Sequence, residues 1–84
     1  MHLIKVAAAS LNQTPLDWDR NQANIVRAIR AARQAGVALL CLPELCIPGY
    51  GCEDAFHSRG TVLESWRILQ AILPETHGIA VALG

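Results

Sequence analysis

Glu44 is the residue of this sequence that is best placed for a catalytic role. It comes after Pro43 and the unbroken apolar run of residues 37–42, which has the length of a buried strand. Ligands of open α/β sheets collect outside the carboxyl ends of the strands, so a carboxylate at this position could serve as a general acid or base. The alternative is a solvated loop carboxylate that caps a neighbouring turn, and position alone leaves both interpretations open.

Three cysteines offer thiols, which become nucleophiles or metal ligands when they lose their proton. Cys41, Cys46 and Cys52 are an odd number at uneven spacing without a Cys-x-x-Cys pair, which argues against a disulfide framework and a zinc site. We expect Cys41 to be buried in a strand, and Cys46 and Cys52 to be ordinary packing or loop thiols. This cysteine usage indicates a reducing compartment, by default the cytoplasm.

Neither a metal site nor a phosphate-binding loop is indicated. His2, His57 and His77 are scattered without the spacing of metal ligands. Gly49 and Gly51 lack the further glycine and the helix start that a phosphate-binding loop needs. We therefore expect no cofactor in this segment.

Composition narrows the possible partners. The 84 residues carry 7 Lys and Arg against 7 Asp and Glu, a formal charge of +0 that gives no attraction to nucleic acid or an anionic membrane. No apolar run approaches the roughly 20 residues of a membrane span. With 52% hydrophobic and 17% charged residues, the chain has little polar surface. Because a chain of about half a domain buries only part of its surface, we expect further protein to cover its apolar faces.

The first half of the chain predicts a strand, a helix and a second strand. Residues 3–9 are a short apolar run, expected to be a buried strand, before a turn-forming segment. Asp17 or Asp19 can cap the helix, and Gly36 can end it. The apolar stripe of this helix consists of Ile25, Ile29 and Ala32. The run of residues 37–42 is typical of a strand covered on both faces in a parallel sheet.

The second half predicts a loop, a helix and a third strand. Residues 44–60 are rich in Gly and Pro and predict a loop, whereas residues 61–64 have the form of a capping box at a helix start. The expected apolar stripe of this helix consists of Leu63, Trp66 and Leu69, with Ile72 or Leu73. Residues 79–83 form the third apolar run. The order strand-helix-strand-helix-strand predicts an α/β fold with a parallel sheet, whose two helices cannot cover both faces well.

The segment around Glu44 resembles a known family. Residues 43–50, which read Pro-Glu-Leu-Cys-Ile-Pro-Gly-Tyr, are similar to the Pro-Glu-Leu-x-x-x-Gly-Tyr segment of the carbon-nitrogen hydrolase (nitrilase) superfamily. The continuation Gly-Tyr-x-x-Glu-Asp over residues 49–54 most resembles the glutaminase domains of glutamine-dependent NAD synthetases. The resemblance implies a partial nitrilase-type α-β-β-α sandwich, in which residues 1–84 are the N-terminal portion of a glutaminase domain, incomplete at its C-terminus.

The resemblance implies catalysis by a Glu-Lys-Cys triad, of which Glu44 supplies the glutamate. The triad lysine and cysteine have no counterpart, because the family places both beyond the third strand and Lys5, the only lysine, lies in the first. The isolated chain is therefore expected to be inactive. Tyr50 could line the glutamine pocket or pack under the loop, and Glu53 and Asp54 are expected to cap the short turn that follows them.

In the reaction that the resemblance implies, a cysteine thiolate attacks the side-chain amide of glutamine and forms a thioester. The glutamate moves the protons and the lysine stabilises the oxyanion. The ammonia would pass to a synthetase domain, absent from this segment, that uses ATP and Mg to convert deamido-NAD to NAD. The resemblance also implies that the full protein is a homo-oligomer, with the rest of the glutaminase and synthetase domains as partners. The alternatives are another carbon-nitrogen hydrolase, such as an amidase or nitrilase, and a non-catalytic interaction module.

Overall fold

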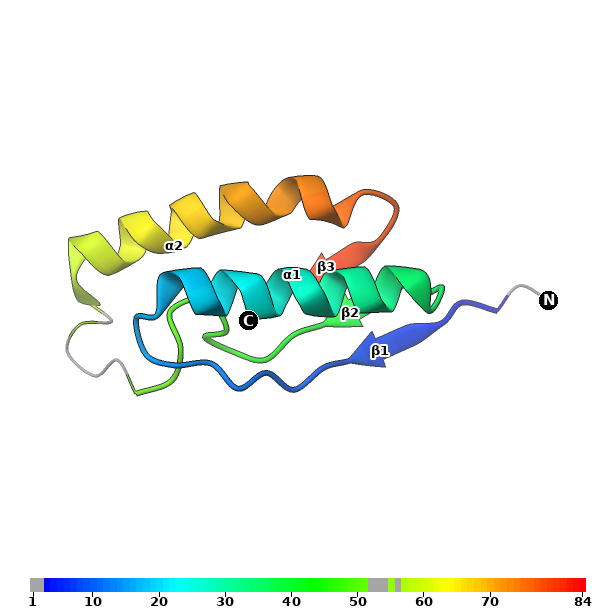
Figure 1. Cartoon of the computed structure of the whole chain (residues 1–84), viewed down its shortest axis with the longest axis horizontal. Helices are drawn as coiled ribbons and strands as arrows, with labels where there is room; N and C mark the ends of the chain where they lie inside the picture. Colours follow the sequence, from blue (N-terminus) through cyan, green and yellow to red (C-terminus); the bar gives the residue numbers. More distant parts are fainter. Residues whose placement is uncertain (1–2, 52–54, 56) are drawn as a thin grey trace.

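The computed structural model describes residues 3–51, 55 and 57–84, in which a small parallel sheet packs beneath two long helices (Figure 1). The elements in chain order are β1 (Val6–Ala8), α1 (Trp18–Gln34), β2 (Leu39–Cys41), α2 (Arg59–Ile72), the 3-10 helix η2 (Leu73–Thr76) and β3 (Ala80–Ala82). The predicted α/β fold and the order strand-helix-strand-helix-strand are confirmed.

The three strands form one parallel sheet in the order β1-β2-β3. Leu40, in the middle of β2, pairs with Ala7 on one side and with Val81 on the other. Beyond the strands, the Leu42 N–H donates to the Ala82 carbonyl oxygen at 2.9 Å. The ladder between β2 and β3 therefore continues toward the residues that follow β2.

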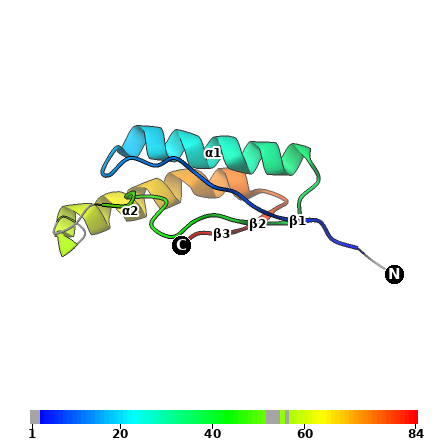
Figure 2. The same ribbon diagram turned by 90° about the horizontal axis from the view of Figure 1, so that it is seen from below.

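Both helices cover the same face of the sheet (Figure 2). Leu40 is 2% exposed and belongs to the core, whereas its neighbours Leu39 and Cys41 are exposed. The prediction that the run of residues 37–42 is covered on both faces, with Cys41 buried, is wrong for the described part of this chain, whereas the prediction that two helices cannot cover both faces well is confirmed. Successive side chains of a strand point to opposite faces, and only one of these faces is covered. We call the exposed side chains of the three strands the bare face, which consists of Val6, Ala8, Leu39, Cys41, Ala80 and Ala82.

Helix α1 forms as the sequence predicts. Its side chains Ile25, Ile29 and Ala32 are buried in the core. Asp17 is the N-cap residue and accepts a hydrogen bond from the backbone N–H three residues on, at 3.3 Å. Gly36 follows the helix with φ +77°, in the conformation that commonly ends helices. The local signals and the burial pattern of this helix therefore agree.

Helix α2 begins earlier than the capping-box pattern predicts. Its N-cap residue is Ser58, whose hydroxyl oxygen accepts a hydrogen bond from the Thr61 N–H at 3.1 Å. Thr61 consequently lies inside the first turn, where its side chain is buried.

Helix α2 also presents a different side to the sheet from the predicted one. Its other buried side chains are Ile68 and Ile72, whereas Leu63 and Trp66 of the predicted stripe are 56% and 60% exposed. Trp66 lies about 160° round the helix from Ile68, so the two cannot face the sheet together. Of the remaining predicted members, Ile72 is buried as predicted, Leu69 is half-buried against the core, and Leu73 is exposed.

Candidate functional site

Glu44 lies three residues beyond the carboxyl end of β2. It opens a turn of residues 44–48 and is exposed. Gly84, which follows β3, packs so closely against this turn that a Cβ atom at residue 84 would overlap the Cα atom of Glu44. Glu44 is therefore placed where the ends of two parallel strands meet, which is where open α/β sheets bind their ligands.

The turn that carries Glu44 has a strained backbone at its second residue. Leu45 has φ +53°, in the left-handed region that a Cβ atom disfavours, and its carbonyl oxygen accepts a hydrogen bond from the Gly49 N–H at 2.8 Å. In the loop before α1, Leu16 has φ +59°, and its N–H donates to the Pro48 carbonyl oxygen at 2.7 Å. Strained residues of this kind persist only where the surrounding structure holds them.

Three side-chain amides hold these two loops together. We call Gln13, Asn21 and Asn24 the amide cluster. Asn21 of α1 is completely buried. Its Nδ2 donates to the carbonyl oxygens of Thr14 and Ile47 at 2.8 and 2.9 Å, and its Oδ1 accepts from the Thr14 N–H at 3.0 Å. Asn24 Nδ2 donates to Gln13 Oε1 at 2.8 Å, which fixes the orientation of that amide.

Gln13 adds a second connection to the same turn. Its Nε2 donates to the Cys46 carbonyl oxygen at 2.6 Å and to the Asn21 carbonyl oxygen at 3.1 Å. Gly49 closes the contact between the loops, because a Cβ atom there would lie 2.7 Å from the carbonyl oxygen of Thr14. Among the described residues, no buried side-chain nitrogen or oxygen lacks a hydrogen-bond partner. The turn after β2 is thus fixed to helix α1 as well as to the sheet.

The Cys46 side chain is buried inside this turn. It is 1% exposed, and burial raises the pKa of the thiol, although a hydrogen bond with the Gly84 backbone opposes that rise. A thiol whose pKa is raised stays protonated near neutral pH and is a poor nucleophile. The prediction that Cys46 is a packing thiol is therefore confirmed.

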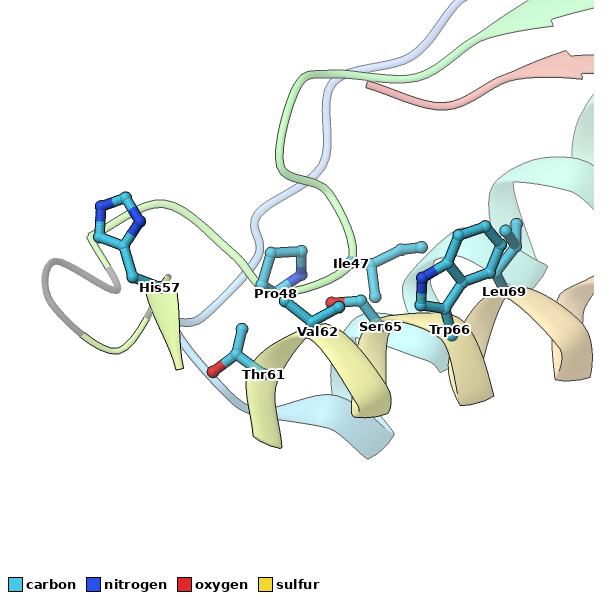
Figure 3. Close-up of a pocket in the computed structure, with 8 residues that line it drawn as sticks. All are labelled: Ile47, Pro48, His57, Thr61, Val62, Ser65, Trp66 and Leu69. Atoms are coloured by element: carbon cyan, nitrogen blue, oxygen red, sulfur yellow. The ribbon is translucent and has the colours of Figure 1, made fainter. Parts of the chain in front are cut away.

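An apolar groove of about 480 Å³ lies between the turn and α2 (Figure 3). Its lining includes Pro48 from the turn and Trp66 from the helix, but neither Glu44 nor Tyr50. Tyr50 is 57% exposed, so the expectation that it packs under the loop is wrong for this chain. Its proposed contact with substrate stays a prediction.

Several residues that the sequence singled out lie outside the described part of the chain, namely His2, Cys52, Glu53 and Asp54. The predicted caps at residues 53 and 54 therefore stay predictions. His57 and His77 are exposed. Within the described residues, no group of three or more His, Cys, Asp and Glu side chains could hold a metal ion. Neither helix of that part is long and apolar enough to cross a membrane.

Sequence reasoning missed the amide cluster. One signal could have found its central member, because Asn21 precedes Ile25 by four residues and Ile29 by eight and so continues the apolar stripe of α1. A polar side chain on the buried side of a helix must find hydrogen-bond partners. Gln13 and Asn24 carry no comparable signal, since their partners come together only in the folded chain.

Comparisons with known proteins agree with this geometry. A model of the carbon-nitrogen hydrolase family matches residues 5–84. The chain is 41% identical over 86 aligned positions to a glutamine-dependent NAD(+) synthetase from Oryza sativa subsp. indica, and 40% identical over 85 to one from Saccharomyces cerevisiae. These alignments cover 100% and 99% of this chain, but the chain spans only 12% of the length of either relative.

A solved structure of a glutamine-dependent NAD(+) synthetase also has the same fold over this segment. The glutamine-dependent NAD(+) synthetase from Cytophaga hutchinsonii superposes with a TM-score of 0.93 at 44% sequence identity. The superposition covers 96% of this chain and 14% of that protein.

Proposed function

The chain belongs to the carbon-nitrogen hydrolase family, and on that premise we propose that it is the N-terminal portion, residues 1–84, of a glutamine-hydrolysing amidase domain. Such a domain would supply ammonia for the ATP-dependent conversion of deamido-NAD to NAD. The observation that carries this proposal is the place of Glu44 at the joined ends of β2 and β3, in a chain that superposes on a glutamine-dependent NAD(+) synthetase.

Glu44 is the catalytic acid and base in this proposal. It takes the proton from a cysteine thiol, returns that proton to the departing ammonia and then activates the water that hydrolyses the thioester. Tyr50, exposed on the same loop, would contact the glutamine substrate. A carboxylate needs an enclosed site for such proton transfers, since exclusion of water raises its pKa. Glu44 is exposed in this chain, so further protein would have to enclose it.

The other two triad residues would come from outside these 84 residues. Lys5 lies before β1, at the amino end of the sheet and so opposite to Glu44, and its Nζ donates to the Ala35 carbonyl oxygen at 2.7 Å. Cys46 is buried with a raised pKa. We therefore expect the isolated chain to release no ammonia from glutamine above the buffer rate.

The partners in this proposal are glutamine as substrate, the remainder of the glutaminase domain, and a synthetase domain that holds ATP and Mg. The complete protein would be a homo-oligomer in the cytoplasm, without nucleic acid or membrane contacts. The bare face favours a second candidate, an interaction module without catalytic function, because its apolar side chains are available to a partner.

A chimera tests the proposed function directly. This chain would replace the matching N-terminal segment of the Cytophaga hutchinsonii synthetase, and NAD formation would be measured with glutamine and, separately, with ammonium. Because added ammonium bypasses the glutaminase step, Glu44→Gln should lower the glutamine-dependent rate by about 10²- to 10⁴-fold and leave the ammonium-dependent rate unchanged.

The matched control is Glu64→Gln, at a partly exposed glutamate of α2 that pairs with Arg67 at 2.9 Å. It should leave both rates unchanged. Retention of the glutamine-dependent rate by Glu44→Gln would contradict the proposed role, and so would a chimera that uses ammonium but never glutamine. A non-catalytic module predicts the latter result.

A further inference from the structure

We infer that Asn21 is a positioning residue for Glu44, acting through the backbone of the turn that follows β2. For its catalytic consequence, this inference rests on the proposed function of Glu44. The structural part, that the Asn21 amide sets the conformation of this turn, stands on the contacts described here.

The first observation is the burial and full hydrogen bonding of Asn21. The residue is 0% exposed, so it cannot touch substrate. Its Nδ2 donates to the Ile47 carbonyl oxygen at 2.9 Å and to the Thr14 carbonyl oxygen at 2.8 Å. One amide thus holds the turn of residues 44–48 and the loop before α1 at a fixed separation. Without that amide, two carbonyl oxygens would lose a buried donor.

The second observation is the strained backbone beside Glu44. Leu45 has φ +53°, and the next two carbonyl oxygens, those of Cys46 and Ile47, accept hydrogen bonds from Gln13 and Asn21. A leucine adopts this conformation only where its surroundings impose it. These two hydrogen bonds fix the backbone directly after Leu45. They are therefore placed to hold the φ angle of Leu45, and with it the orientation of Glu44.

The third observation is the packing on the other side of Glu44. Gly84 lies against its backbone, leaving no room for the turn to shift toward β3. Glu44 is therefore held between the end of β3 and the amide cluster, while the residue itself is exposed. A catalytic carboxylate needs such support, because a displacement of about 1 Å can cost about 10²-fold in rate.

The test uses the chimera with Asn21→Leu, which keeps a similar volume and removes the amide. Ile29→Ala is the matched control, since Ile29 is buried on the same side of α1 but lies eight residues, or about 12 Å, from Asn21. We expect Asn21→Leu to lower the glutamine-dependent kcat by about 10²-fold, with the ammonium-dependent rate unchanged. Ile29→Ala should keep the glutamine-dependent kcat within about threefold at temperatures well below its unfolding midpoint.

Crystal structures of the chimera and its Asn21→Leu variant supply the second readout. We expect φ of Leu45 to leave the left-handed region and the Glu44 carboxylate to move. Retention of both would overturn the inference, as would an equal loss of kcat in Ile29→Ala, which would assign the effect to stability alone. If Asn21→Leu does not fold, Gln13→Met, at a half-buried loop position, should give the same changes to a smaller extent, and their absence would equally overturn the inference.

The two proposals fail in different ways. If Glu44→Gln keeps its glutamine-dependent rate, the proposed function is wrong, whereas φ of Leu45 in Asn21→Leu still decides whether the amide sets the turn. If Glu44→Gln is inactive with glutamine but Asn21→Leu is unaffected in rate and structure, only the positioning role is wrong.

Discussion

The two helices cover the same face of the sheet, but they use their surfaces differently. Helix α1 buries Ile25 and Ile29 against the sheet, and with Asn21 it also binds the turn that carries Glu44. Helix α2 buries only Thr61, Ile68 and Ile72 and leaves a second apolar stripe exposed. That stripe consists of Val62, Leu63 and Trp66, and Leu73 at the start of η2 continues it. Contacts with both the sheet and the turn fix the rotation of α1 about its axis. The sequence pattern of α2 does not fix its rotation in the same way, because either apolar stripe could face the sheet.

The largest expected effect is a difference in the free energy of unfolding between two variants, one that truncates a buried apolar residue of α1 and one that truncates an exposed apolar residue of α2. Ile29→Ala in the isolated chain should lower the free energy of unfolding by about 2–5 kcal/mol, because it leaves a cavity in the core. Trp66→Ala should change it by less than about 0.5 kcal/mol, since the side chain is 60% exposed. Urea denaturation followed by far-UV circular dichroism measures both. A large loss in Trp66→Ala would break the comparison by showing that the second stripe is covered in solution.

The N-cap residues of the two helices should contribute about equally to stability. Asp17→Ala removes the acceptor at the start of α1, and Ser58→Ala removes the corresponding acceptor of α2. Each should cost about 1 kcal/mol, because one backbone N–H of the first turn loses its partner. The same denaturation experiment measures this loss, with Asp17→Asn and Ser58→Thr as controls that keep a capping side chain. A much larger loss at one cap would show that its helix depends on local signals more than the other does.

The smallest effect concerns the ion pair between α1 and η2. Arg30 donates to both carboxylate oxygens of Glu75, at 2.6 and 3.1 Å, and these hydrogen bonds lower the pKa of Glu75. A carboxyl group whose pKa is lower in the folded state stabilises the fold above its ordinary pKa of about 4.3, and this contribution is lost as the pH falls through the folded-state value.

Glu75→Gln should therefore lower Tm slightly near neutral pH and not at all at strongly acidic pH. Thermal unfolding across this pH range measures the difference. Glu64→Gln, which breaks a pair within α2 only, is the comparison variant, because the Arg67 guanidinium likewise lowers the pKa of Glu64. Equal losses in the two variants would show that the bridge between α1 and η2 adds nothing beyond a pair within one helix.

The same contrast explains how much of the fold could be predicted from the sequence. For α1, the apolar spacing and the terminal glycine were predicted correctly, and the N-cap residue, Asp17, is one of the two predicted candidates. For α2, Thr61 and Glu64 resemble a capping box, but Ser58 is the cap that the structure uses. The apolar run of residues 37–42 wrongly predicted cover on both faces and so missed the exposure of Leu39 and Cys41, although the count of two helices correctly predicted that both faces could not be covered well.

Part of the candidate site could likewise be predicted from the sequence and part could not. The position of Glu44 could be predicted, because the end of the apolar run of residues 37–42 indicates the carboxyl end of a parallel strand, and Glu44 follows it closely. Its support could not be predicted, since Gln13 and Cys46 lie 33 residues apart in the chain and come together only in the folded structure. Asn21 was missed as well, although its place four residues before Ile25 in the apolar stripe of α1 was a signal that could have identified it as a buried polar residue.

The order of the strands has a consequence for synthesis. Each strand pairs with its neighbour in the sequence, β1 with β2 and β2 with β3, so no strand has to be inserted between two that formed earlier. A nascent chain emerges from the ribosome at about 5–20 residues per second, and its N-terminal parts generally fold first. The β1-α1-β2 unit can therefore assemble before α2 has left the ribosome. The turn with Glu44 would then emerge next to an α1 helix that already presents Asn21.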